Sequence, residues 1–153
     1  MSLPQLVVLA LLGTLASSQS RPAQAGQVPP ATKITVYKDP SCGCCHSWIE
    51  HLRKHGFEVV VRDTNDVSGA KRSGGVPPQL QTCHTAFVNG YVVEGHVPAA
   101  DIRRMLDEKP RIAGIGVAGM PAGSPGMEVG GLKDKYDVIA FNRDGTTRVF
   151  ARH

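Results

Sequence analysis

Apolar residues recur along this chain with two spacings, one typical of strands and one typical of helices. Apolar runs rich in β-branched residues occupy positions 33–38 and 57–62, as expected for buried strands. Between them, Trp48, Ile49 and Leu52 fall on one face of a helix whose other positions are mostly polar or charged. This part of the chain therefore predicts a strand, a helix and a second strand in that order.

The remainder of the chain predicts two hairpins and one more helix. Strands within 85–94 flank an Asn-Gly pair, which is a strong hairpin signal. Pro98 begins a helix with a regular apolar face. A stretch dense in Gly and Pro at 113–131 predicts a loop, and a second hairpin is predicted over 136–151. Several glycines leave the segment 63–75 ambiguous, and they weaken the short helix expected there.

The predicted order is β-α-β-(α)-β-β-α, and Cys42-x-x-Cys45 lies between the first strand and the first helix. This combination indicates a thioredoxin-like arrangement. We therefore predict an α/β protein with a thioredoxin-like fold, to which a Gly/Pro/Met loop and a C-terminal β-hairpin are added.

The N-terminus has the pattern of a secretory signal peptide over residues 1–25. An apolar stretch at 6–15 is too short to span a bilayer as a helix, and Ala23-Gln24-Ala25 is a typical cleavage site. No Lys or Arg precedes the apolar stretch, so an uncleaved membrane anchor is the alternative. Residues 26–32 are predicted to be a flexible leader, and 33–153 a single exported domain without a stable membrane span.

Composition excludes few classes of function. The chain has 153 residues, 41% hydrophobic and 20% charged, which is enough for one packed domain. The net charge of +4 is not concentrated in a Lys/Arg tract, and aromatic residues are not interleaved with basic ones. We therefore expect no nucleic-acid partner.

All four cysteines lie in two short clusters, Cys42-Gly43-Cys44-Cys45-His46 and Cys83-His84. In the predicted fold, the loop that enters the third strand lies against the helix N-terminus, so four sulfurs and two imidazoles meet. A helix N-terminus stabilises thiolates, but four thiolates repel one another. A bound cation removes that repulsion, so the clusters predict a metal site.

The spacing of the cysteines favours copper over zinc. Zinc ribbons pair two Cys-x-x-Cys units, whereas Cys44 and Cys45 are adjacent and rarely bind one tetrahedral ion together. Adjacent thiolates can instead bridge several ions, and Cu(I) prefers thiolate and thioether ligands. The expected cofactor is copper as Cu(I), with more than one ion. Further residues could be ligands or could hydrogen-bond to ligands: His46, His84, His96, Met120 and Met127.

Five segments resemble the CopG-type copper-resistance proteins, an exported bacterial family long catalogued as a domain of unknown function. The segments are 37–45, 75–78, 83–85, 90–98 and 119–128, within a match over about residues 33–151. The resemblance implies a thioredoxin-like fold, a place in periplasmic copper handling, and copper ions and other exported copper-handling proteins as partners. It also implies that the four cysteines Cys42, Cys44, Cys45 and Cys83 are the metal thiolates, and a redox role is proposed for the family.

Two other interpretations of the cysteines stay open. Cys42 and Cys45 could form the redox pair of a periplasmic thiol–disulfide oxidoreductase, which requires only two thiols. The four cysteines could also form two structural disulfides, but this pairing requires Cys83. Whether the protein is an enzyme, as a copper or thiol oxidoreductase, is not decided by the sequence.

Several other side chains have ordinary explanations in the sequence. Trp48 is predicted to be a core residue, and Glu94 an ordinary hairpin residue. His51 and His55 are expected on a solvated helix face, and His153 in a disordered terminus.

Overall fold

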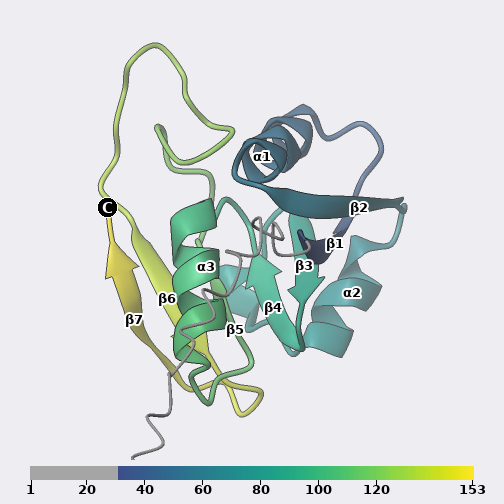
Figure 1. Cartoon of the computed structure of the whole chain (residues 1–153), viewed down its shortest axis with the longest axis vertical. Helices are drawn as coiled ribbons and strands as arrows, with labels where there is room; N and C mark the ends of the chain where they lie inside the picture. Colours follow the sequence, from purple (N-terminus) through teal and green to yellow (C-terminus); the bar gives the residue numbers. More distant parts are fainter. Residues whose placement is uncertain (1–30) are drawn as a thin grey trace, which may run out of the picture.

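The structure, a computed structural model, describes residues 31–153, which form one mixed sheet with helices packed against it (Figure 1). In chain order the elements are β1 (Thr32–Lys38), α1 (Gly43–Lys54), β2 (Phe57–Asp63), α2 (Val67–Gly74), the 3₁₀ turn η1 (Pro78–Leu80), β3 (His84–Val88), β4 (Tyr91–Glu94), α3 (Ala99–Glu108), β5 (Gly114–Gly116), β6 (Asp137–Phe141) and β7 (Thr147–Arg152). The predicted signal peptide and most of the predicted leader lie outside the described residues. Within 31–153, no helix has both the length and the apolar character needed to span a bilayer.

The seven strands are hydrogen-bonded in the order β2-β1-β3-β4-β5-β6-β7. β1 runs parallel to β2 and antiparallel to β3, and β3 is antiparallel to β4. Together with α1, α2 and α3, these four strands follow the element order that the sequence predicts. The prediction of an α/β protein is therefore confirmed.

The strand β5 is absent from the sequence prediction, which assigns the whole of 113–131 to a loop. β5 pairs in parallel with β4 and antiparallel with β6, so it joins the predicted C-terminal hairpin to the main sheet. Gly114 lies opposite Val92, and a Cβ at Gly114 would collide with the Val92 carbonyl. Glycine is needed here for close strand approach, whereas the sequence pattern favours a turn.

The ambiguous segment contains the regular helix α2. Its N-cap is Asp66, whose carboxylate accepts a hydrogen bond from the Gly69 amide at 3.1 Å. Its C-cap is Gly75, which adopts a left-handed φ of 66°. Two well-formed caps therefore offset the low helix propensity of the internal glycines.

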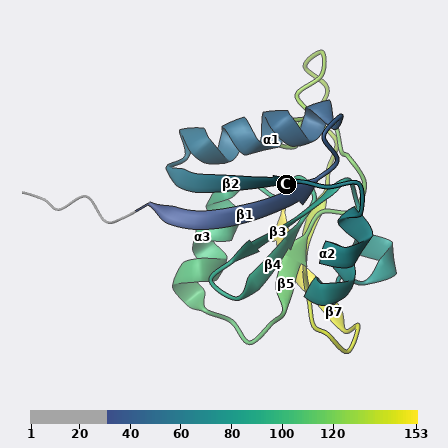
Figure 2. The same cartoon turned by 90° about the vertical axis from the view of Figure 1, so that its right-hand side faces the viewer.

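The core lies between the sheet and two helices. Trp48, Ile49 and Leu52 of α1 are fully buried, and Ile102 of α3 belongs to the same core. α2 lies on the opposite side of β1 and β2 from α1 (Figure 2). The Trp48 Nε1–H donates a hydrogen bond to the Val97 carbonyl at 2.9 Å, and the prediction that Trp48 is a core residue is confirmed.

His51 caps the N-terminus of α3. Its Nε2 accepts a hydrogen bond from the Ala99 amide at 3.1 Å, while the N-cap residue Pro98 supplies no side-chain acceptor. The predicted solvated role is therefore wrong for His51. His55 remains exposed, and its Nδ1 lies 2.7 Å from the His51 carbonyl oxygen.

The cap makes the stability of the fold sensitive to acid. Partial burial, followed by the charge of His55, lowers the pKa of His51 from 6.5, although Glu128 acts in the opposite direction. Between 6.5 and the lowered pKa, the unfolded chain binds a proton that the native protein excludes. The free energy of unfolding should therefore fall as the pH drops below 6.5, and more steeply in the wild type than in His51→Gln.

Urea unfolding of the metal-free protein between about pH 5 and pH 8 measures this slope. His46→Gln, on an exposed position of the same helix, is the matched control and should keep the wild-type slope. Equal slopes for His51→Gln and His46→Gln would contradict the role of His51.

The C-terminus is ordered, contrary to the prediction for His153. The His153 amide donates to the Tyr136 carbonyl at 2.9 Å, and the two rings stack with centroids 5.0 Å apart. His153 Nε2 also lies 2.7 Å from a carboxylate oxygen of Asp101 on α3. These contacts attach the C-terminal residue, which follows β7, to Tyr136 and to α3.

Candidate metal centre

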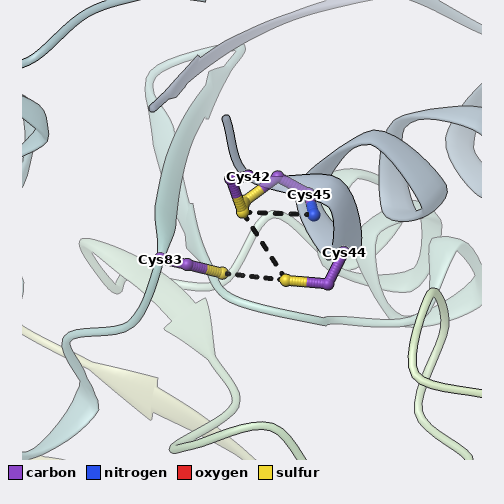
Figure 3. Close-up of side chains that lie close together, drawn as sticks. All are labelled: Cys42, Cys44, Cys45 and Cys83. Carbon is purple, nitrogen blue, oxygen red and sulfur yellow. Dashed lines mark hydrogen bonds between the residues drawn. A yellow bond between two sulfur atoms is a disulfide. The ribbon is translucent and has the colours of Figure 1, made fainter. Parts of the chain in front are cut away.

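The four cysteines come together between the N-terminus of α1 and the start of β3 (Figure 3). Their sulfur atoms all lie within 4.8 Å of one another. Cys42 and Cys45 form a disulfide, with Cα atoms 5.4 Å apart, while Cys44 and Cys83 are free thiols. The Cys44 sulfur lies 3.5 Å from that of Cys42 and 3.9 Å from that of Cys83. The predicted convergence of the two clusters is therefore observed.

A turn before α1 presents the first cluster. The Asp39 carboxylate accepts a hydrogen bond from the Ser41 amide at 2.8 Å, and the Asp39 carbonyl accepts one from the Cys42 amide at 3.1 Å. Hydrogen bonds from Ser41 lower the pKa of Asp39. Cys42 is the N-cap residue, and its sulfur accepts a hydrogen bond from the Cys45 amide at 3.4 Å. The helix N-terminus therefore faces the sulfurs with its unpaired amides and favours negative charge on them.

Two buried imidazoles lie on the other side of Cys83. The Cys83 sulfur is 3.3 Å from His84 Nδ1 and 3.7 Å from His96 Nε2. The second nitrogen of each ring faces a backbone carbonyl: His84 Nε2 is 3.0 Å from Gly95 O, and His96 Nδ1 is 2.8 Å from Pro125 O. A carbonyl can only accept a hydrogen bond, so these second nitrogens carry the protons. The lone pairs of His84 Nδ1 and His96 Nε2 are thus left facing the Cys83 sulfur.

Burial keeps these groups uncharged. Burial, and then the neighbouring His96, lower the pKa of His84 to about 3, and burial lowers the pKa of His96. Both imidazoles are therefore neutral at pH 7, the form that binds a metal. Burial and the neighbouring Cys44 raise the pKa of the Cys83 thiol to about 12. A cation that binds Cys83 must displace its proton, and the positive charge of the ion favours that loss.

The other predicted donors are less closely placed. His46 is exposed, and among the described residues it belongs to neither group of closely spaced donor atoms. Met120 is 54% exposed, whereas Met127 is half-buried. The structure thus brings His84 and His96 to the cysteines and leaves His46 outside.

The loop between β5 and β6, which we call the covering loop, passes beside α1 (Figure 1) and contacts the first turns of that helix at Gly126. A Cβ at Gly126 would lie 2.7 Å from the Trp48 amide nitrogen and 3.0 Å from the Cys44 carbonyl oxygen, so the loop backbone touches the helix directly. The preceding residue, Pro125, supplies the carbonyl that binds His96. The Gly/Pro/Met loop is therefore part of the wall of the metal centre.

A buried ion pair between Lys71 and Glu94 lies near Cys83, and the sequence pattern does not predict it. Glu94 is fully buried, and its carboxylate lies 2.6 Å from Nζ of Lys71 on α2. The expectation that Glu94 is an ordinary hairpin residue is therefore wrong. No local pattern reveals the pair, because its two members lie on separate elements of the fold.

Two solved structures of copper resistance protein CopG, Form 1 and Form 2, match this chain with a TM-score of 0.76 each. Each is 45% identical to it, and each match covers 80% of this chain and 98% of the other. The chain belongs to the CopG family. The resemblance predicted from the sequence is thereby confirmed. A family model described as "Protein of unknown function, DUF411" also matches residues 80–127, and a comparison with curated proteins found no match.

The two comparisons differ in how much of the chain they cover. The family model matches a segment that contains Cys83, both buried imidazoles and the loop up to Met127. The matches to the CopG structures cover most of the chain. Membership of the CopG family thus rests on most of the chain and not on one motif alone.

Proposed function

We propose that this CopG-family protein is an exported copper-binding protein that holds Cu(I) through Cys42, Cys44, Cys45 and Cys83, in copper resistance or homeostasis. The observation that carries the proposal is the convergence of four sulfur atoms within 4.8 Å. Thiolates are soft ligands that select Cu(I). The CopG relatives at 45% identity, which are named for copper resistance, support the same ion.

The donor set fits more than one ion. Cys44 and Cys45 are adjacent, so their sulfurs are better suited to bridging two ions than to sharing one tetrahedral ion. His84 and His96 add neutral nitrogen donors next to Cys83. Met127, half-buried on the loop between β5 and β6, is a candidate thioether ligand. Copper is the cargo of this site, received from and passed to other exported copper-handling proteins in the periplasm.

The Cys42–Cys45 pair also suits a redox step on the cargo. In the reduced protein, this pair transfers two electrons to two Cu(II) ions. Two S–H bonds break, one S–S bond forms, and the products are two Cu(I) ions, one disulfide and two released protons. Because disulfide sulfurs are poor ligands, this redox step and the binding of Cu(I) by all four cysteines belong to different oxidation states of the Cys42–Cys45 pair.

Anaerobic titration with Cu(I) against a competing chelator tests the proposal. The reduced protein is expected to bind several Cu(I) ions tightly and to lose most of that affinity when its cysteines are oxidised, since a disulfide sulfur is a poor ligand. A parallel titration with Zn(II) is the control and should show weaker binding. Weak binding of a single Cu(I), with zinc equal to copper, would contradict a copper site.

A periplasmic thiol–disulfide oxidoreductase is the second candidate function. The specific observation in its favour is the Cys42–Cys45 disulfide at the N-terminus of α1, where a lowered thiol pKa is typical of such enzymes. This function needs neither Cys44 nor Cys83. The two candidates therefore predict different results for replacement of Cys44.

A further inference from the structure

The carboxylate of Glu94 accepts an unusually complete set of hydrogen bonds for a fully buried acid. Its donors are Lys71 Nζ at 2.6 Å, the Thr82 amide at 2.6 Å, the Thr82 hydroxyl at 3.3 Å and the Thr85 hydroxyl at 2.7 Å. Lys71 Nζ donates in addition to the Thr85 hydroxyl oxygen at 3.1 Å. The Lys71–Glu94 pair thus connects α2 and β4 to Thr82 and Thr85, which lie close together in the sequence.

That segment is the one that carries the second cysteine cluster. Thr82 and Thr85 stand immediately before and after Cys83-His84. The next residue after Glu94 continues the pattern, because the Gly95 amide donates to the His84 carbonyl at 3.3 Å and the Gly95 carbonyl binds the His84 ring. Two consecutive residues at the end of β4, Glu94 and Gly95, therefore hydrogen-bond to the Cys83-His84 segment and to the residues that flank it.

Burial of an ion pair needs a reason beyond stability. Removing two charges from water costs free energy that their attraction repays only in part, and apolar replacements of buried pairs are often neutral or stabilising. A carboxylate with four donors, in contrast, fixes the direction of each donor. What the pair supplies here is geometry: it sets the position of the backbone on either side of Cys83.

We propose that Lys71 and Glu94 are positioning residues for Cys83, which keep its sulfur facing Cys44 across the metal centre. The proposal concerns the same site as the proposed Cu(I) function, and its consequence for copper rests on that function. Among the described residues, neither Lys71 nor Glu94 belongs to the groups of closely spaced donor atoms. Both act through Thr82 and Thr85 on the thiol between them.

The disulfide form of the protein allows a test without copper, because Cys44 and Cys83 are then the free cysteines and their sulfurs lie 3.9 Å apart. A short bifunctional thiol reagent attached to Cys44 should reach Cys83 and link the two sulfurs. Because burial raises the pKa of the Cys83 thiol to about 12, the linking rate is compared in each variant with single modification of Cys83 by a monofunctional reagent of the same kind. Glu94→Gln keeps the shape of the side chain but removes its charge, and it should slow the linking about tenfold or more, since small displacements strongly reduce such reactions. The same variant, when reduced, should bind Cu(I) about 10- to 100-fold more weakly.

A second variant separates positioning from folding. Lys71→Met combined with Glu94→Leu removes both buried charges, but the Thr82 amide and the Thr85 hydroxyl lose their acceptor, so the fold of this variant is checked directly. We expect Cys44 and Cys83 to be linked slowly in this double variant. An unfolding measurement on the same sample shows whether the variant is folded. Wild-type linking in the double variant, or in Glu94→Gln, would overturn the proposal.

The surface pair of Glu50 and Arg53 provides the matched control. Their side chains are 2.7 Å apart and each is 44% exposed, so Glu50→Gln makes the same acid-to-amide change away from Cys83. This control should link at the wild-type rate. Failure of wild-type Cu(I) binding would overturn the proposed function, whereas the linking rates decide the positioning role independently.

Discussion

Replacement of Cys83 or of Cys44 by serine is expected to weaken Cu(I) binding by more than about 100-fold, since even partners outside the ligand set cost 10- to 100-fold. Cys83 is the donor that joins the two parts of the centre: its sulfur lies 3.9 Å from that of Cys44 and 3.3 Å from His84 Nδ1. A serine hydroxyl at either position is a hard and uncharged donor that Cu(I) does not favour. Without Cys83, the remaining sulfurs all come from one end of α1.

Competition against a Cu(I) chelator under anaerobic conditions measures both variants. Ser73→Ala, on an exposed position of α2 away from the cysteines, is the control and should retain wild-type affinity. Unchanged binding in both cysteine variants would refute the four-thiolate site. Cys44→Ser also separates the two candidate functions, because the oxidoreductase predicts full turnover of a test disulfide by Cys42 and Cys45 in that variant.

The parts of the fold that depend on local patterns could be predicted from the sequence. The apolar face of Trp48, Ile49 and Leu52 predicts α1, and all three side chains are fully buried. β5 could not be predicted, because the reason for glycine at 114 is its close contact with the backbone of β4, which the sequence does not show. The ordered C-terminus depends likewise on contacts of His153 with distant residues.

The same division applies to the metal centre. The Cys-x-x-Cys spacing, combined with a fold in which the third strand begins beside the first helix, was enough to predict four converging sulfurs. The orientation of the imidazoles could not be predicted, because it depends on the carbonyls of Gly95 and Pro125. The Lys71–Glu94 pair could not be predicted either, because two charged residues 23 positions apart form no local sequence pattern.

The covering loop gives the second large expected effect: Gly126→Ala should release Cu(I) about 10- to 100-fold faster than the wild type. Gly126 has a φ of 83°, and a Cβ there would lie 2.7 Å from the Trp48 amide nitrogen. The clash is with helix backbone, which cannot rotate away, so the loop must lift from α1. Overpacking of this kind costs about 1–3 kcal/mol, and about 1.4 kcal/mol corresponds to a factor of ten.

Lifting the loop removes the Pro125 carbonyl from His96 Nδ1, where it now lies at 2.8 Å. The His96 ring is then free to turn its lone pair away from Cys83, and the half-buried residues Cys42, Cys44 and Cys83 become more exposed to water. Both changes favour dissociation more than association, so the effect should appear in the rate of copper release. Stopped-flow transfer of Cu(I) to excess chelator measures that rate.

Gly130→Ala separates the clash from the strain in the backbone. Gly130 lies in the same loop with a positive φ of 58°, but a Cβ there would meet nothing within 4 Å. It carries the same kind of conformational cost without contact to α1, so its release rate should stay close to that of the wild type. Equal acceleration of Cu(I) release in the two variants would mean that general loosening of the loop controls release. Acceleration in Gly126→Ala alone would mean that the contact of the loop with the first turns of α1 controls it.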